Sequence, residues 1–340
     1  MKKSFKLFLL ISVAAVFAGC DDKNFEDDKK TESEYYEFPL SVQEDGFEAG
    51  DNGVTINVSE VDEKNIVFNL VPGPAVKSYR LDVYPKAMLY NLLLNEGCLM
   101  TPQETCEDKV IQLLTNSSGS GAYIFNSTDE GFASGKEFDW ANTEYSQAPI
   151  VPDCEYYILV LGCYDDNGEN PASLSIARVV TPVKELVGDP QIAIDAEVGY
   201  RAFIVRYHPN EDCKQFYHWI WSTEEIGEYI DLFGEKMMRD FCRSATMSAY
   251  DATLEENLSV KRSFELADGI IRENTAVAVA VDANGTPSAE IMRYDFSLMQ
   301  IPEGDFTPRA TVMAGDRICA TLAYFDVEME KSCMSCFYRL

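Results

Sequence analysis

Two stretches of this chain carry the same order of strand and turn signals, and this repetition limits the possible folds more than any other feature. The first stretch runs over 151–180 and the second over 275–296. Each contains a segment of alternating apolar and polar residues, an Asn-Gly pair and a closing alternating segment. Alternation indicates strands with one buried face. Asn-Gly favours a hairpin because both residues tolerate positive φ. The pattern therefore predicts antiparallel β structure.

The region before each stretch is repeated as well. Two alternating segments and a turn-rich link lead to a strand that contains Tyr79 in the first copy and Tyr217 in the second. A third copy leads to Tyr338. Repeats of this length indicate tandem modules, and we place them at 46–184, 188–300 and 306–340. The third has strands A–C only. We expect it to be truncated relative to a longer relative or to borrow strands from a neighbour. A short appendage on the second module is the other interpretation.

The order of these signals resembles a fibronectin type III domain. Tyr156 matches the family's corner tyrosine, whose hydroxyl holds the turn between strands E and F. In the second module Thr275 lies near that position, so the corner is lost there. The resemblance implies a mainly β fold of tandem immunoglobulin-like, fibronectin type III-like sandwiches, and it extends to tandem modules of Bacteroidota surface lipoproteins. It implies little about function, since such sandwiches support many activities.

A helical pattern follows strand C in both complete modules. It covers 86–94 in the first and 223–233 in the second, and a further helical stretch is expected over 235–243. In the second module Thr223 is a plausible N-cap. Its apolar residues recur at helical spacing on one face. Each sandwich is therefore predicted to carry a short helical insertion after strand C.

The N-terminus carries the signals of a bacterial lipoprotein. A positive start and an apolar run end in small residues followed by Cys20, which resembles a lipobox. The resemblance implies a signal peptide over 1–19 and acyl chains such as palmitate on Cys20, which anchor the chain in a membrane. An ordinary secretory signal is the alternative. The polar and acidic residues of 20–45 predict a flexible tether.

The acidic residues directly after Cys20 resemble the surface-export signal of Bacteroidota lipoproteins. The resemblance implies an outer-membrane lipoprotein that faces outward, whereas a periplasmic position is the alternative. The whole chain of 340 residues has 28 Lys and Arg against 57 Asp and Glu, for a net charge of −29. Binding to phosphate backbones needs clustered basic residues. A nucleic acid is therefore not expected as a partner.

The sequence offers little material for catalysis. It has two histidines, of which His218 lies inside a strand, and it lacks the motifs of metal sites, nucleophile elbows and phosphate loops. We predict no catalytic residue, no metal site and no cofactor. Cys98 and Cys106 flank a short polar loop and could form a disulfide, but buried thiols are the preferred interpretation.

Two segments are candidate ligand or partner surfaces. In strand C of the second module, Tyr217, Trp219 and Trp221 are expected in the core. The opposite face then presents Phe216, His218 and Ile220, which need a cover from the following helix or from a protein partner. In the first module a loop carries Phe138, Trp140 and Tyr145 among small polar residues. Exposed aromatic rings of this kind suit a glycan.

Together these features predict a lipid-anchored binding or scaffold protein of the cell envelope that is not an enzyme. The alternative is an accessory carbohydrate-binding component of a glycan-uptake or surface hydrolase system.

Overall fold

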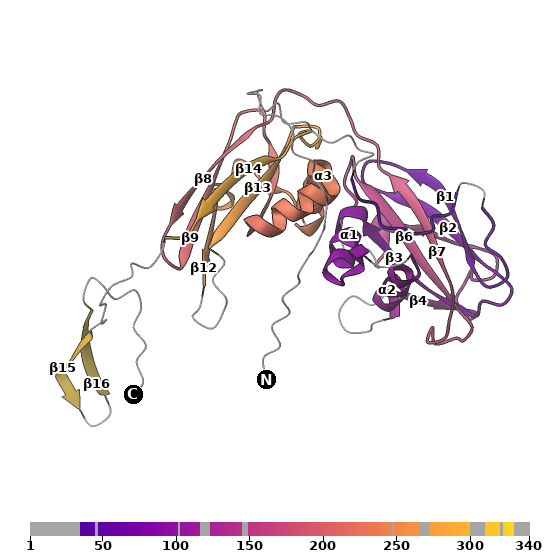
Figure 1. Cartoon of the computed structure of the whole chain (residues 1–340), viewed down its shortest axis with the longest axis horizontal. Helices are drawn as coiled ribbons and strands as arrows, with labels where there is room; N and C mark the ends of the chain where they lie inside the picture. The colour runs from indigo at the N-terminus through magenta and orange to yellow at the C-terminus, as the bar shows by residue number, and fades with distance from the viewer. Residues whose placement is uncertain are drawn as a thin grey trace, which may run out of the picture.

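A computed structural model describes residues 35–44, 47–100, 103–115, 123–144, 149–246, 248–264 and 272–299, together with the backbone of 310–319 and 322–329. The proposed signal peptide 1–19, Cys20 and the tether up to residue 34 lie outside the described residues. Two sandwich modules follow one another along the chain, with helices between them (Figure 1).

Module 1 is a sandwich of two antiparallel sheets. One sheet has the order β1-β2-β5 and the other β4-β3-β6-β7. The apolar residues that alternate along these strands face each other and are buried, among them Phe68, Tyr79 and Ile158. The strands are β1 Val54–Val61, β2 Ile66–Pro72, β3 Ser78–Pro85, β4 Tyr123–Asn126, β5 Lys136–Asp139, β6 Glu155–Cys163 and β7 Pro171–Val180.

Module 2 repeats this architecture. Its sheets have the orders β12-β9-β8 and β11-β10-β13-β14. Phe203, Val205 and Phe216 lie in its core. The strands are β8 Ile192–Val198, β9 Ala202–Pro209, β10 Gln215–Ser222, β11 Tyr250–Asp251, β12 Ser259–Ser263, β13 Glu273–Val281 and β14 Met292–Ser297. Two successive sandwiches of antiparallel sheets confirm the fold class predicted from the sequence.

The two Asn-Gly pairs lie in loops that are longer than the two-residue loop of a tight hairpin. Gly168 has φ 68° and Gly285 has φ 81°, in the left-handed region that favours glycine. Neither Asn167 nor Asn284 has a positive φ. The two turns are therefore not the tight hairpins that the pairs predict, because those need positive φ at both residues.

The faces of β10 are opposite to those expected. Phe216 packs in the sandwich core of module 2, whereas Tyr217, Trp219 and Trp221 belong to the cluster beneath the helices. The reason is the alignment of the repeats. β3 ends one residue before α1 and β10 ends one residue before α3, which pairs Tyr79 with Phe216 rather than with Tyr217. A slip of one residue moves every side chain to the other face of a strand.

The helices gather on one face of each module (Figure 1). They are α1 Lys86–Asn95, α2 Gln103–Thr115 and α3 Thr223–Ala245, with short 3-10 turns at Cys98–Met100, Trp140–Asn142 and Glu255–Leu258. The sequence did not predict α2. Gly234, with φ 88°, interrupts α3 and separates it into the two helical stretches expected there. None of the helices in the described ranges has the length and apolar content of a membrane-spanning segment.

In the region of the expected third module, β15 Ala310–Cys319 pairs antiparallel with β16 Leu322–Met329. The register shifts between Ala314 and Ile318. The first two expected strands, near 310–312 and 317–324, are thus replaced by one long strand and its partner. The expected strand C at the end of the chain lies outside the described residues.

Candidate functional site at the interface of the modules

The two modules share one apolar cluster, to which their helices contribute. Leu89, Tyr90 and Leu93 come from α1, and Ile226, Tyr229 and Phe233 come from α3. The hydroxyl of Tyr229 donates a hydrogen bond of 2.9 Å to the backbone oxygen of Ala87. This contact joins the helices of different modules directly. Burial of large apolar side chains from both sides makes the interface resemble a domain core.

The start of α3 is fixed by its own sequence. Ser222 caps the helix, since its hydroxyl accepts a 3.1 Å hydrogen bond from the backbone N–H of Glu225. The Glu225 carboxylate in turn lies 2.6 Å from that hydroxyl. Glu224 and Glu225 place negative charge in the first turn, where the helix dipole favours it. The N-cap is thus Ser222, one residue before the Thr223 expected from the sequence.

Residues 35–44, which we call the strap, cross the interface. The backbone N–H of Tyr36 donates to Leu232 of α3 at 2.8 Å, and its hydroxyl donates to Leu99 at 2.9 Å. Phe38 is 5% exposed and its ring contacts Tyr90 and Phe233. The strap therefore packs against both modules. Residues 35–44 therefore do not belong to a flexible tether, which was expected over 20–45, because alternate aromatic residues here are buried against an apolar surface.

The strap meets α3 at the interruption of the helix. A Cβ atom at Gly234 would lie 2.8 Å from the ring of Tyr35. Glycine is required here for two reasons, the left-handed φ and the close approach of that ring. The same glycine therefore both interrupts α3 and makes room for the strap.

A row of charged groups continues from the strap into module 1. Lys86 lies 2.8 Å from Glu37 and 3.4 Å from Glu155, and Arg178 lies 2.7 Å from Glu155. The hydroxyl of Tyr90 donates to Glu37. Burial favours the protonated acid, but the hydrogen bonds from Lys86 and Tyr90 outweigh it and hold the pKa of Glu37 below its usual value. The strap is thus held by charge as well as by Phe38.

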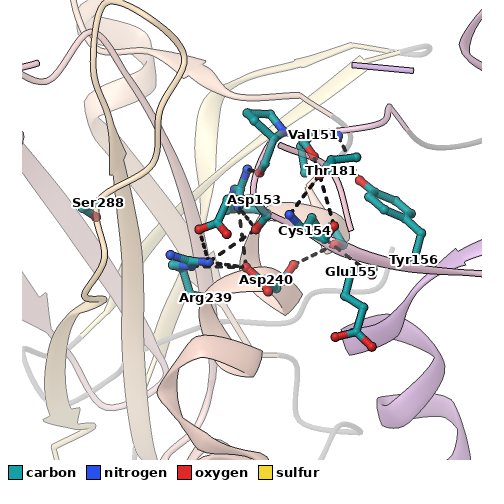
Figure 2. Close-up of polar contacts among 12 residues, drawn as sticks. Val151, Asp153, Cys154, Glu155, Tyr156, Thr181, Arg239, Asp240 and Ser288 are labelled. Atoms are coloured by element: carbon teal, nitrogen blue, oxygen red, sulfur yellow. Dashed lines mark hydrogen bonds and ion pairs between the residues drawn. The ribbon is translucent and has the colours of Figure 1, made fainter. Parts of the chain in front are cut away.

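A second ionic cluster joins α3 to the turn before β6 (Figure 2). Arg239 lies 2.7 Å from the carboxylate of Asp153 and 3.1 Å from that of Asp240. Arg243 lies 3.5 Å from Asp240 and donates to the backbone oxygens of Pro152 and Asp153. Residues of module 2 therefore bind both the side chain and the backbone of a turn in module 1.

The three residues that α3 contributes to this cluster are almost completely buried, whereas the side chain of Asp153 is 29% exposed. Arg239 and Asp240 are each 4% exposed and Arg243 is 1% exposed. Burial raises the pKa of Asp240, and the two arginines oppose that rise. Burial also raises the pKa of the neighbouring Cys154 thiol to about 12, with the Asp240 charge as a further cause. The thiol of Cys154 is therefore protonated. The geometry of the ionic cluster supports a structural role, which is to hold the two modules together.

The corner tyrosine lies beside this cluster (Figure 2). Tyr156 is 1% exposed, and its hydroxyl accepts a 2.9 Å hydrogen bond from the backbone N–H of Val151. This is the contact expected of a tyrosine corner. The Thr181 hydroxyl donates to the backbone oxygen of Val151 at 2.7 Å and accepts from Cys154 N–H at 3.0 Å. The turn that receives Arg239 and Arg243 is thereby fixed from within module 1.

The aromatic residues expected to form a glycan surface in module 1 are placed differently. Phe138 and Trp140 are each 2% exposed and pack against Phe68 in the sandwich core. Phe138 is buried because β5 pairs with β2 and directs its ring inward. Trp140 is buried in the 3-10 turn that follows β5. Tyr145 lies outside the described residues.

The candidate residues of module 2 do not form an open surface either. Phe216 is fully buried in the core, and Ile220 packs against the same cluster. His218 stacks between Tyr207 and Tyr250, at ring distances of 4.9 and 4.6 Å. Burial lowers the pKa of His218 to about 4. Phe216, His218 and Ile220 therefore lie together on β10 of module 2. Phe138 and Trp140 lie apart from them, in the core of module 1.

Other polar groups lie under the helices of module 1. Arg80 donates to the backbone oxygens of Gly168 and Leu114, at 2.7 and 3.3 Å, and so links a turn to the end of α2. Burial raises the pKa of Asp82 to about 6. Among the residues that the structure describes, no group of three or more His, Cys, Asp or Glu is arranged to hold a metal ion. Cys98 and Cys106 are both buried, and the Cys106 sulfur lies 3.8 Å from the Cys98 carbonyl oxygen.

Neither the strap nor the ionic cluster is predicted by the sequence patterns, although the residues of both can be recognised in the sequence. Tyr36 and Phe38 alternate with charged residues inside a segment that its composition assigns to a tether. Arg239 and Arg243 are one helical turn apart, with Asp240 between them. Such spacing on a helix is common at solvated surfaces. Only the packing of module 1 against α3 distinguishes this cluster from a surface one.

No protein-family model and no curated protein sequence matches the chain. The solved structures that align with it include the FN1–FN3 domains of chicken CNTN1 and the central fibronectin-III array of RIM-binding protein. The first is 7% identical, with 72% of this chain and 66% of that chain covered and a TM-score of 0.24. The second is 8% identical, with 77% and 74% covered and a TM-score of 0.19. The chain thus spans slightly less than two thirds of the first structure.

The sheets define the class of protein. Each module pairs a three-stranded with a four-stranded antiparallel sheet over one core. The chain is a mainly β protein with tandem fibronectin type III-like sandwiches and helical insertions after the third strand. Proteins of this class share a fold and not an activity.

Proposed function

We propose that the chain is a lipid-anchored protein of the bacterial outer membrane that faces outward and acts as a binding scaffold without a catalytic site of its own. Its anchor would be the acylated Cys20, and its ligand would be a protein or a glycan presented at the cell surface. The proposal takes the lipobox and the acidic residues after it from the sequence.

One observation carries the scaffold role. The strap continues from the proposed anchor and binds both modules, through Tyr36, Phe38 and the Glu37–Lys86 ion pair of 2.8 Å. The ionic cluster of Arg239 and Asp153 adds a second connection between the modules. An anchor attached at this position would hold the modules as one unit, with a fixed relation between their outer surfaces.

The experiment is protease treatment of intact cells that express the full chain, beside cells that express Cys20→Ala. We expect the wild-type chain to fractionate with the outer membrane and to be degraded by external protease. Cys20→Ala should leave the membrane fraction. Protection of the wild-type chain in intact cells, with digestion after lysis, would show that it faces the periplasm. A soluble wild-type chain would overturn the anchor itself.

A further inference from the structure

Module 1 contains a cleft of about 700 Å³ beside the strap. Strap residues 41–44 form one wall, and the turn 49–53 that precedes β1 forms a second. Residues 173–175 at the start of β7 form the third wall, and Phe47 lies at the rim. None of the predicted site residues that the structure describes lines this cleft.

Hydrogen bonds fix the walls to one another. The Gln43 side chain donates to the backbone oxygen of Val54 and accepts from the N–H of Ile56, both at 3.3 Å. The Ser175 hydroxyl accepts from the N–H of Val54 at 3.2 Å. The strap, β1 and β7 are thus connected through side chains whose polar atoms are already engaged. The cleft is formed before any ligand arrives, which lowers the entropy cost of binding.

The turn that forms the second wall is held from behind. The N–H of Gly73 donates to the Gly53 backbone oxygen at 2.8 Å. A Cβ atom at Gly73 would lie 2.4 Å from the Asp51 backbone oxygen. The backbones pack so closely that the turn cannot recede from the cleft. Its exposed side chains, Asp51 and Asn52, are therefore presented from a rigid support.

The lining combines an aromatic ring with hydrogen-bonding groups. Phe47 is 51% exposed. Glu44, Asp51 and Asn52 are also exposed, and within the described part of the chain the side chains of Asp51 and Asn52 make no hydrogen bond. Among the described residues that line the cleft there is no Lys, Arg or His. The exposed polar groups of this lining are carboxylates and an amide.

This chemistry selects among ligand classes. A phosphate or carboxylate ligand would meet Glu44 and Asp51 without a cation to offset the repulsion. A purely apolar ligand would leave the polar groups without partners. A sugar ring satisfies both kinds of group, because its C–H face packs on an aromatic ring while its hydroxyls donate to carboxylates and exchange hydrogen bonds with an amide. We propose that the cleft binds a neutral saccharide, independently of whether the chain is lipid-anchored.

The test is calorimetric titration of the purified full chain with neutral hexasaccharides of glucose, mannose and xylose, and with hexagalacturonate as the anionic comparator. We expect at least one neutral hexasaccharide to bind and hexagalacturonate not to bind. Phe47→Ala and Asp51→Ala should each weaken binding by about tenfold. The matched control is Tyr164→Ala, which removes an aromatic ring that is 38% exposed elsewhere on module 1 and should leave the affinity unchanged.

A blocking variant separates loss of the site from loss of the fold. A Cβ atom at Gly50, which lines the cleft, meets no atom within 4 Å. Gly50→Trp adds a large ring at a cleft-lining position that has room for a Cβ atom, so it should abolish binding with an unchanged unfolding midpoint. Gly227→Trp is the control, since a Cβ atom there also meets no atom within 4 Å. The proposal is overturned if no neutral hexasaccharide binds at millimolar concentration, if Gly50→Trp binds normally, or if only hexagalacturonate binds.

Discussion

The guanidinium of Arg239 lies 2.7 Å from the carboxylate of Asp153, in the turn that precedes β6 of the other module. Asp153 is the only non-glycine residue with a positive φ, 49°, in the described ranges. Aspartate tolerates that conformation better than most residues do. The turn thus exposes its carboxylate and its backbone oxygen toward α3, and both are bound by arginines.

We expect Asp240→Asn to destabilise the chain by about 3–5 kcal/mol, because it removes the carboxylate between two buried guanidinium groups. The free energy of unfolding, measured by urea titration with tryptophan fluorescence, checks this. Trp219 and Trp221 contact Phe241 of the same helix and report on it. The control is Asp195→Asn, whose partners Arg206 and His208 are exposed and whose loss should change stability little. Equal effects of the two variants would contradict a structural role for the cluster.

His218 should make the chain less stable in acid. Its pKa is about 4 in the folded chain, below the ordinary 6.5, because the ring is buried. As the pH falls below 6.5 the unfolded chain takes up a proton and the folded chain does not, so stability is lost between pH 6.5 and about 4. At pH 5 the loss is about 2 kcal/mol.

His218→Phe keeps a ring between Tyr207 and Tyr250 and removes this proton. We expect it to match the wild-type stability at pH 7.5 and to exceed it at pH 5, in urea titrations at both values. His208→Gln alters the other, exposed histidine and should retain the wild-type loss in acid. If His218→Phe lost stability in acid as steeply as the wild type, the titrating group would lie elsewhere.

Tyr156→Phe should destabilise module 1 by about 1–3 kcal/mol, because the buried N–H of Val151 loses its acceptor. Thermal unfolding measures the change, and amide hydrogen exchange at Val151 localises it. Tyr164→Phe removes a hydroxyl from an exposed ring and serves as the matched control. Unchanged exchange at Val151 in Tyr156→Phe would mean that the corner does not depend on this hydrogen bond.

The parts of the fold that depend on local patterns could be predicted. Alternation identified five strands of each sandwich but not β4, β5, β11 or β12. The 3.6-residue period identified the helices after β3 and β10. The face of β10 could not be derived in this way. Apolar residues occupy both of its faces, so the alternation between Phe216 and Tyr217 gives no direction, and the alignment of the repeats was off by one residue.

The candidate sites depend on contacts between distant segments, which one sequence does not reveal. Phe138 and Trp140 were expected at the surface because small polar residues surround them, yet both are buried, Phe138 in β5 paired with β2 and Trp140 in the turn that follows. Phe47 lies in a segment of similar composition and is exposed. Local composition does not distinguish the buried rings from the exposed one. Only the tertiary structure shows which of them belongs to a core.

The strap also determines where mechanical load would enter the molecule. A pull on the N-terminal side of residue 35 first meets the contacts of Tyr36 and Phe38 with α1 and α3, and only afterwards the hydrogen bond of Gln43 to Ile176 of β7. Tension is therefore received at the joint of the two modules before it reaches a sheet.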